Sequence, residues 1–120
     1  MGKKIMLVDD AAFMRMMIKD TLQKNGYTEI VEAGNGEQAV ATYTAERPDL
    51  VLMDITMPVM DGLEALKRLK EMYPDVKVVM CSAMGQETMV VDALKLGAKD
   101  FIVKPFKPDR IMKTVNSILG

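Results

Sequence analysis

Short runs of aliphatic residues alternate with longer amphipathic segments along the whole chain, and this alternation limits the possible folds more than any other feature. The aliphatic runs are typical of buried strands, and the segments between them repeat apolar residues at helical spacing. The expected strands are Ile5–Val8, Thr28–Ala33, Asp49–Asp54, Val76–Ser82 and Asp100–Lys104. Hydrophobic strands that alternate with helices predict a mostly parallel sheet covered on both faces.

Five helical segments follow the five strands. The first has its apolar face at Met14, Met17, Ile18, Thr21 and Leu22 and stops at Asn25-Gly26. The second follows Asn35 and has its inner face at Ala39, Val40 and Tyr43, and the third follows the capping box Asp61–Glu64 and has its inner face at Leu63, Leu66 and Leu69 or Tyr73. The fourth ends before Gly97 and has its inner face at Met89, Val90, Ala93 and Leu94. The fifth begins at Pro108 and has its inner face at Ile111, Met112, Val115, Ile118 and Leu119. Right-handed crossovers then predict an α/β, doubly wound, five-stranded parallel sheet of order 2-1-3-4-5, with a flavodoxin-like arrangement.

Composition restricts the function classes. With 120 residues and 49% hydrophobic residues, the chain fits one domain over residues 1–120. The 16 basic and 17 acidic residues nearly cancel, so we expect neither nucleic acid nor a membrane as partner. The single cysteine, Cys81, and the lack of a signal peptide or long apolar span favour the cytoplasm. The absence of histidine excludes Ser-His-Asp and Cys-His catalysis and histidine-ligated zinc.

Polar residues with chemical potential stand at the ends of the expected strands. Asp9 and Asp10 follow the first strand, Asp54 ends the third, Ser82 the fourth and Lys104 the fifth. In an open parallel sheet, the carboxyl ends of the strands meet at one edge, where ligands bind. We therefore expect these five side chains to form one acidic pocket.

Three crowded carboxylates need a cation or protons to offset their repulsion. Ligands that are all oxygen favour a hard ion, Mg²⁺ or Mn²⁺. Lys104 would supply a second positive charge for a phosphoryl group, and Ser82 a hydroxyl donor. Because an aspartate is already an ionised nucleophile, the pattern predicts phosphoryl transfer onto a carboxylate.

Four motifs in order carry a family resemblance over the whole chain. They are "VDD" at 8–10, "MDITMPVMDG" at 53–62, "SAMG" at 82–85 and "FIVKPF" at 101–106. Together they resemble the receiver domain of two-component response regulators, and "DDAAFMRMM" and "SAMGQ" are most similar to the single-domain chemotaxis regulators. The resemblance implies a phosphorylation-activated switch without an effector domain, rather than an enzyme acting on a substrate.

The resemblance also implies residue roles in the metal and phosphoryl site. Asp54 would be the phosphoacceptor, and Asp10 and Asp54 would bind Mg²⁺ directly together with the backbone carbonyl of Thr56. Asp9 would act mainly through bound water. Lys104 would contact the phosphoryl oxygens, and the Lys104-Pro105 peptide bond would be cis.

Further roles concern switching and the loss of the phosphoryl group. After transfer, Ser82 would hydrogen-bond the phosphoryl group and Phe101 would rotate inward, changing the face formed by the fourth helix, fifth strand and fifth helix. Thr56 and Met84 would flank the water that hydrolyses the acyl phosphate. Because Met84 cannot orient that water by hydrogen bonding, we predict slow self-dephosphorylation, and we also expect self-phosphorylation from small acyl phosphates.

The implied partners are proteins, and the chain is expected to be a monomer. They are a sensor histidine kinase of the chemotaxis type, the flagellar motor switch protein and a dedicated phosphatase. Phe13 and Met16 fall off the inner stripe of the first helix, so we expect them to be exposed, as part of a docking patch.

Several alternatives stay open. A single-domain phosphorelay intermediate would have the same pocket. A Mg²⁺-dependent aspartate phosphatase normally has a second acid two residues after its nucleophile, where this chain has Thr56. A flavodoxin-like carrier should have a phosphate-binding loop rich in Ser, Thr and Gly after its first strand, where this chain has Asp9 and Asp10. These two aspartates could also simply cap the first helix, and Cys81 is interpreted as a small core residue.

Overall fold

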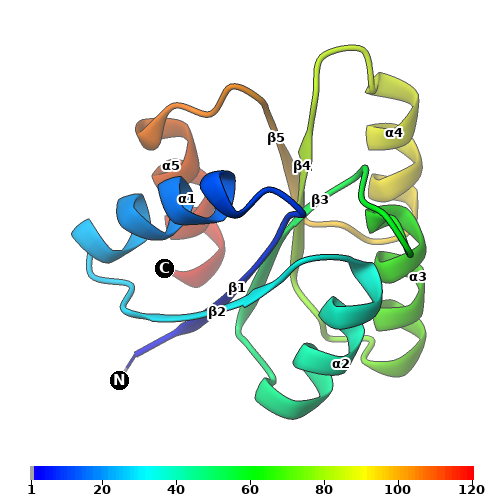
Figure 1. Ribbon diagram of the computed structural model, residues 1–120, viewed down its shortest axis with the longest axis horizontal. Coiled ribbons are helices and arrows are strands. Elements are labelled where there is room, and N and C mark those ends of the chain that lie inside the picture. The colour runs from blue at the N-terminus through cyan, green and yellow to red at the C-terminus, as the bar shows by residue number, and fades with distance from the viewer. Residues whose placement is uncertain (1) are drawn as a thin grey trace.

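The computed structural model describes residues 2–120 and contains a five-stranded parallel sheet with helices on both faces (Figure 1). The strands are β1 (Lys4–Val8), β2 (Glu29–Ala33), β3 (Leu50–Asp54), β4 (Val78–Ser82) and β5 (Asp100–Val103). The helices are α1 (Ala12–Lys24), α2 (Gly36–Glu46), α3 (Gly62–Met72), α4 (Glu87–Lys95) and α5 (Pro108–Leu119). The sheet order β2-β1-β3-β4-β5 confirms the predicted doubly wound fold.

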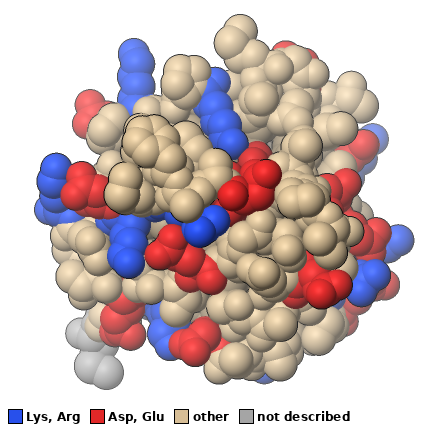
Figure 2. Space-filling model, viewed as in Figure 1, with Lys and Arg blue, Asp and Glu red and all other residues tan. Residues whose placement is uncertain are grey.

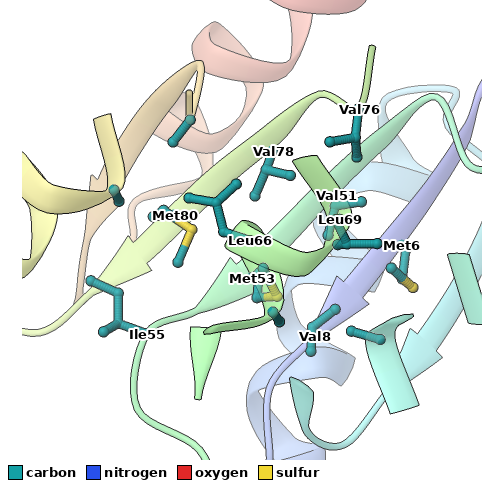
Figure 3. Close-up of a cluster of buried hydrophobic side chains, with 14 of the residues drawn as sticks. Met6, Val8, Val51, Met53, Ile55, Leu66, Leu69, Val76, Val78 and Met80 are labelled. Carbon is teal, nitrogen blue, oxygen red and sulfur yellow. The ribbon is translucent and has the colours of Figure 1, made fainter. Parts of the chain in front are cut away.

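The sheet separates two hydrophobic cores. Helices α1 and α5 cover one face, and α2, α3 and α4 cover the other (Figure 1). Successive residues of a strand point to opposite faces, so Ile5 and Leu7 belong to one core and Met6 and Val8 to the other. Figure 3 shows Leu66 and Leu69 of α3 among the buried side chains of β1, β3 and β4. The central strands are therefore buried on both faces, as their unbroken aliphatic runs predict.

Two helices begin at the caps that the sequence indicates. The side chain of Asn35 accepts a hydrogen bond from the backbone N–H of Gln38 at 2.9 Å, at the start of α2. The side chain of Asp61 accepts one from the backbone N–H of Glu64, also at 2.9 Å, at the start of α3. Each cap satisfies a backbone donor that has no partner within its helix. The caps fix where the loops after β2 and β3 end.

Three residues assigned to inner helix faces are instead exposed. The exposed fractions are 45% for Met17, 42% for Met89 and 42% for Leu94. Helix α1 buries only Ile18 and Leu22 in full, and α4 only Val90 and Ala93, because each lies on the sheet along a narrow stripe. A helix with more apolar residues than its stripe can bury leaves the extra ones in solvent.

The prediction for α1 was correct at two other positions. Phe13 and Met16 are 64% and 59% exposed, as expected for residues beside the inner stripe.

Strand β4 begins at Val78 rather than Val76, because the N–H of Val76 donates to the carbonyl of Tyr73 in a turn. Within residues 2–120, none of the helices combines the length and the apolar character that a bilayer crossing requires.

Candidate functional site

The carboxyl ends of the strands bring the predicted site residues to one edge of the sheet. Val8 pairs with Met53 in the parallel ladder, so Asp9 and Asp54 follow at the same level of two neighbouring strands. Asp54 pairs with Cys81, and Ser82 pairs with Val103, the residue before Lys104. The strand register therefore collects these side chains in the expected place.

Three carboxylates form the acidic part of the site. Asp9, Asp10 and Asp54 each offer an oxygen atom, and these three atoms lie within 4.8 Å of one another. Asp9 and Asp54 are only 4% and 7% exposed, whereas Asp10 is open to solvent. Buried like charges at this separation repel strongly unless a cation is near.

Lys104 supplies that positive charge. Its ammonium nitrogen lies 3.1 Å from a carboxylate oxygen of Asp54 and 3.3 Å from one of Asp9. The backbone N–H of Lys104 also donates to the carbonyl of Ser82 at 2.7 Å, and the peptide bond to Pro105 is cis, as expected. One lysine thus joins the ends of β1, β3 and β5.

Burial and neighbouring charges shift the pKa of two groups. Burial raises the pKa of Asp54 above its ordinary value, Asp9 adds to the rise, and Lys104 offsets only part of it. Burial would lower the pKa of Lys104, but its hydrogen bond with Asp54 and its attraction to both carboxylates raise it overall. Lys104 is therefore fully protonated at neutral pH, and the Asp54 carboxylate is less well stabilised than it would be in water.

Every polar group of Asp9 is engaged. Its backbone N–H donates to the carbonyl of Ala33 at 3.2 Å, and one carboxylate oxygen accepts from the N–H of Ala11 at 2.8 Å. The carbonyl of Asp9 accepts a hydrogen bond from the guanidinium of Arg15. Ala11, not an aspartate, occupies the N-cap position of α1, so the simple capping interpretation of Asp9 and Asp10 is wrong.

Arg15 is a residue that the sequence interpretation missed. Its guanidinium also forms an ion pair with Glu32 of β2 at 2.9 Å, which fixes its direction. Arg15 thus connects α1, the edge strand and the backbone of the first site aspartate. No local motif indicates these contacts, because the two partners of Arg15 lie on β2 and in the loop after β1.

The proposed switch residues lie together beside a cavity. Ser82 is 1% exposed, and Phe101 on β5 is half-buried. Both line a cavity of about 310 Å³ between β5 and α4, together with Val90 and Leu94. The arrangement leaves space next to the Phe101 ring.

Thr56 and Met84 lie in the loops after β3 and β4. Both are exposed, and Met84 is 82% exposed. The hydroxyl of Thr56 accepts a hydrogen bond from the side-chain amide of Gln86 at 2.8 Å. Gln86 belongs to the "SAMGQ" motif, but the sequence interpretation gave it no role, since the motif does not show which residues its side chain contacts.

The donor set suits a hard divalent cation. All three side chains offer carboxylate oxygen, which Mg²⁺ and Mn²⁺ prefer, and a soft or nitrogen-preferring metal would lack its usual ligands here.

Across the face in Figure 2, basic and acidic side chains are interspersed, without a broad patch of one sign. A small anion would therefore be attracted by Lys104 and a bound cation rather than by a general basic surface.

Comparison with known proteins identifies relatives of the whole chain. Residues 5–116 match the family model described as response regulator receiver domain. The chain is 58% identical to the chemotaxis protein CheY of Bacillus subtilis over 120 residues, which is 100% of both chains. It is 40% identical to the sporulation initiation phosphotransferase F of the same organism, over 99% of this chain and 95% of the relative.

A solved structure agrees with these matches. The crystal structure of the CheX-CheY-BeF3-Mg+2 complex from Borrelia burgdorferi contains a chain that is 36% identical, with a TM-score of 0.93. The match covers 98% of this chain and 90% of that one. The pocket of aspartates and lysine, the sheet order and these matches lead to one conclusion: the chain belongs to the response regulator receiver family.

Proposed function

We propose that the protein is a phosphorylation-activated signalling switch in which Asp54 accepts a phosphoryl group. The observation that carries the proposal is the ammonium of Lys104, held 3.1 Å from Asp54 and 3.3 Å from Asp9. This lysine lies beside the proposed nucleophile, where the negative charge of an incoming phosphoryl group would develop.

In the reaction, a carboxylate oxygen of Asp54 attacks the phosphorus of a phosphohistidine or of a small acyl phosphate. The new P–O bond forms as the bond from phosphorus to the leaving nitrogen or oxygen breaks. Lys104 remains protonated and binds the phosphoryl oxygens as a point charge. Burial raises the pKa of Asp54, so the metal-free protein stabilises this carboxylate less well than water does.

The metal-binding part of the proposal involves four residues. Asp10 and Asp54 would hold Mg²⁺ or Mn²⁺ directly with the backbone carbonyl of Thr56, and Asp9 would act mainly through water. When bound, the ion supplies charge neutralisation between the carboxylates and the phosphoryl oxygens. The convergence of three carboxylate oxygens within 4.8 Å supports this assignment.

Phosphorylation would then change the surface around α4 and β5. The phosphoryl group brings about two negative charges and new acceptor oxygens, which attract the hydroxyl of Ser82. Ser82 and Phe101 line the same cavity of about 310 Å³, so a shift of Ser82 allows the ring to turn inward. The face of α4, β5 and α5 would thereby gain or lose affinity for a partner protein.

We propose that residues 1–120 act as a single receiver domain in chemotaxis, by binding other proteins. The relative that is 58% identical, from Bacillus subtilis, is named as a chemotaxis protein, which supports this role. The partners would be a chemotaxis-type sensor histidine kinase and the flagellar motor switch protein. A dedicated phosphatase is a third partner, and we expect a cytoplasmic monomer.

The first experiment measures intact mass after incubation with acetyl phosphate and Mg²⁺. Wild-type protein should gain one phosphate, which is lost on treatment with hydroxylamine. The Asp54→Ala variant and a sample with chelator should gain none, whereas the surface variant Asp20→Ala should behave as wild type. A phosphate gained equally by Asp54→Ala would contradict the assignment of the phosphoacceptor.

A phosphorelay intermediate is the second candidate, because the chain is 40% identical to a protein named as a sporulation phosphotransferase. Such a protein would pass its phosphoryl group on to a histidine of a second protein. Phosphorylated protein mixed with histidine-phosphotransfer domains from the source organism distinguishes the two. Rapid transfer to one of them favours the relay, and binding of the phosphorylated form to the motor switch protein favours chemotaxis.

A further inference from the structure

The side chain of Gln86 connects the two loops that flank Asp54. Its amide oxygen accepts a hydrogen bond from the backbone N–H of Ala83 at 2.6 Å, directly after Ser82. Its amide nitrogen donates to the hydroxyl of Thr56 at 2.8 Å, two residues after Asp54. One side chain thus joins the loop after β3 to the loop after β4.

The side chain of Gln86 does not cap the helix that it precedes. Gln86 occupies the N-cap position of α4, yet it makes no side-chain cap for that helix. At the corresponding positions of α2 and α3, Asn35 and Asp61 do cap their helices. The amide of Gln86 instead connects the two loops, and its nitrogen also donates to the sulfur of Met89 in α4 at 3.8 Å.

The connected loops are those that must move in the proposed switch. Ala83 follows Ser82 in the chain, so a displacement of Ser82 toward Asp54 also moves the backbone N–H of Ala83, which donates its hydrogen bond to Gln86. Gln86 also lines the cavity of about 310 Å³ beside Phe101 and Val90. The bridge is therefore in contact with both the moving loop and the space into which the ring would turn.

We infer that Gln86 is a latch that holds the loop after β4 in its unphosphorylated position. Gln86 acts through Ala83 and Thr56, so it is a positioning residue and not a catalytic one. The latch must open before Ser82 can approach the phosphoryl group, and its strength sets how readily the protein becomes active. This inference rests on the proposed function.

The test uses beryllium fluoride with Mg²⁺ as a non-hydrolysable substitute for the phosphoryl group. Gln86→Met keeps an unbranched side chain of similar length and removes both hydrogen bonds between the loops, together with the weak bond to the sulfur of Met89. Because the latch opposes the active conformation, we expect calorimetry to show at least about fivefold tighter binding in the variant, the effect of one net hydrogen bond of the two that are removed. Hydrogen exchange in the peptide spanning 82–86 should also be faster in the free variant than in free wild type.

The chain provides a matched control at Gln38. Its amide oxygen accepts from the N–H of Gly34 at 2.8 Å, in the loop after β2, so Gln38→Met removes a similar bond away from the latch. We expect Gln38→Met to bind beryllium fluoride with wild-type affinity. Thr56→Val should shift the affinity in the same direction as Gln86→Met, and the double variant should show little further change.

The outcomes separate the latch from the proposed function. If wild type binds beryllium fluoride and Asp54→Ala does not, the result supports Asp54 as the residue that accepts the phosphoryl group. Equal or weaker binding by Gln86→Met would then overturn the latch alone, as would unchanged hydrogen exchange at 82–86. If wild type fails to bind, the proposed function is refuted and the latch has no switch to control.

Discussion

A single methyl group at Gly62 is predicted to disturb Asp54, the proposed phosphoacceptor. A Cβ atom added there would lie 2.1 Å from the backbone oxygen of Asp54 and 3.0 Å from the Cα of Ile55. Since non-bonded atoms need at least about 3 Å, the two segments must separate by about 1 Å. The N–H of Gly62 also donates to the carbonyl of Ile55 at 2.7 Å, so separation weakens this bond as well.

These distances set the expected size of the effect. Overpacking of this kind costs about 1–3 kcal/mol, and each kcal/mol lowers the melting temperature by roughly 4 °C in a chain of this size. A displacement of about 1 Å at a reacting group can slow the reaction by about 10²-fold. For Gly62→Ala we therefore expect a moderate loss of stability and a large loss of phosphorylation rate.

The assay is the time course of phosphorylation by acetyl phosphate, with urea unfolding measured in parallel. Gly36 gives a matched control, because it also follows an N-cap residue and its Cβ would lie 2.5 Å from a backbone oxygen, that of Met60. Gly36→Ala should lose similar stability but retain more of the rate. A Cβ atom at Gly34 would lie 3.3 Å from the amide oxygen of Gln38, the far end of a flexible side chain. Gly34→Ala should therefore change neither the stability nor the phosphorylation rate. Equal rates for Gly62→Ala and Gly36→Ala would refute the reasoning.

Three further predictions use the same structure. Asp54→Asn should be more stable than wild type at pH 7, because burial raises the folded-state pKa of Asp54 and its carboxylate opposes folding. The difference should vanish below the ordinary value of 3.8, grow between 3.8 and the raised pKa, and level off above the raised pKa; parallel pH profiles from urea unfolding would contradict this. Met84→Glu places a carboxylate at an 82% exposed position beside the site, and should speed decay of the acyl phosphate by at most about 10²-fold, as followed by intact mass. An unchanged decay rate would count against a role for this position. Burial raises the pKa of Cys81 to about 12, so iodoacetamide at pH 8 should label this residue only after unfolding. Rapid labelling of the native protein would show that the thiol is accessible.

The fold and the centre of the site could be predicted because their signals are local and periodic. An unbroken aliphatic run such as Leu50–Met53 predicts a strand buried on both faces, and the residue that ends it lies at the edge of the sheet. Asp9, Asp54 and Lys104 come together for this reason alone, and the pairing of Val8 with Met53 shows it. The caps at Asn35 and Asp61 are equally local.

The errors and omissions concern contacts between elements. Met17 and Leu94 fit the apolar period of their helices but are 45% and 42% exposed, because the width of the buried stripe depends on neighbouring elements. Arg15 and Gln86 lie within the motifs "DDAAFMRMM" and "SAMGQ", but neither motif shows what these side chains contact. Their partners are separated from them by up to 30 residues, so only the folded arrangement reveals the contacts.

The position of Lys104 bears on how the proposed metal ion would be bound. In sites that are held together by the metal alone, the chain is unfolded until the ion binds. Here the ammonium group already lies 3.3 Å from Asp9 and 3.1 Å from Asp54, so it offsets the repulsion between these carboxylates without an ion. We therefore expect the protein to fold before it binds the proposed metal. The ion would then act as a reversible co-reactant whose concentration sets how fast the switch responds.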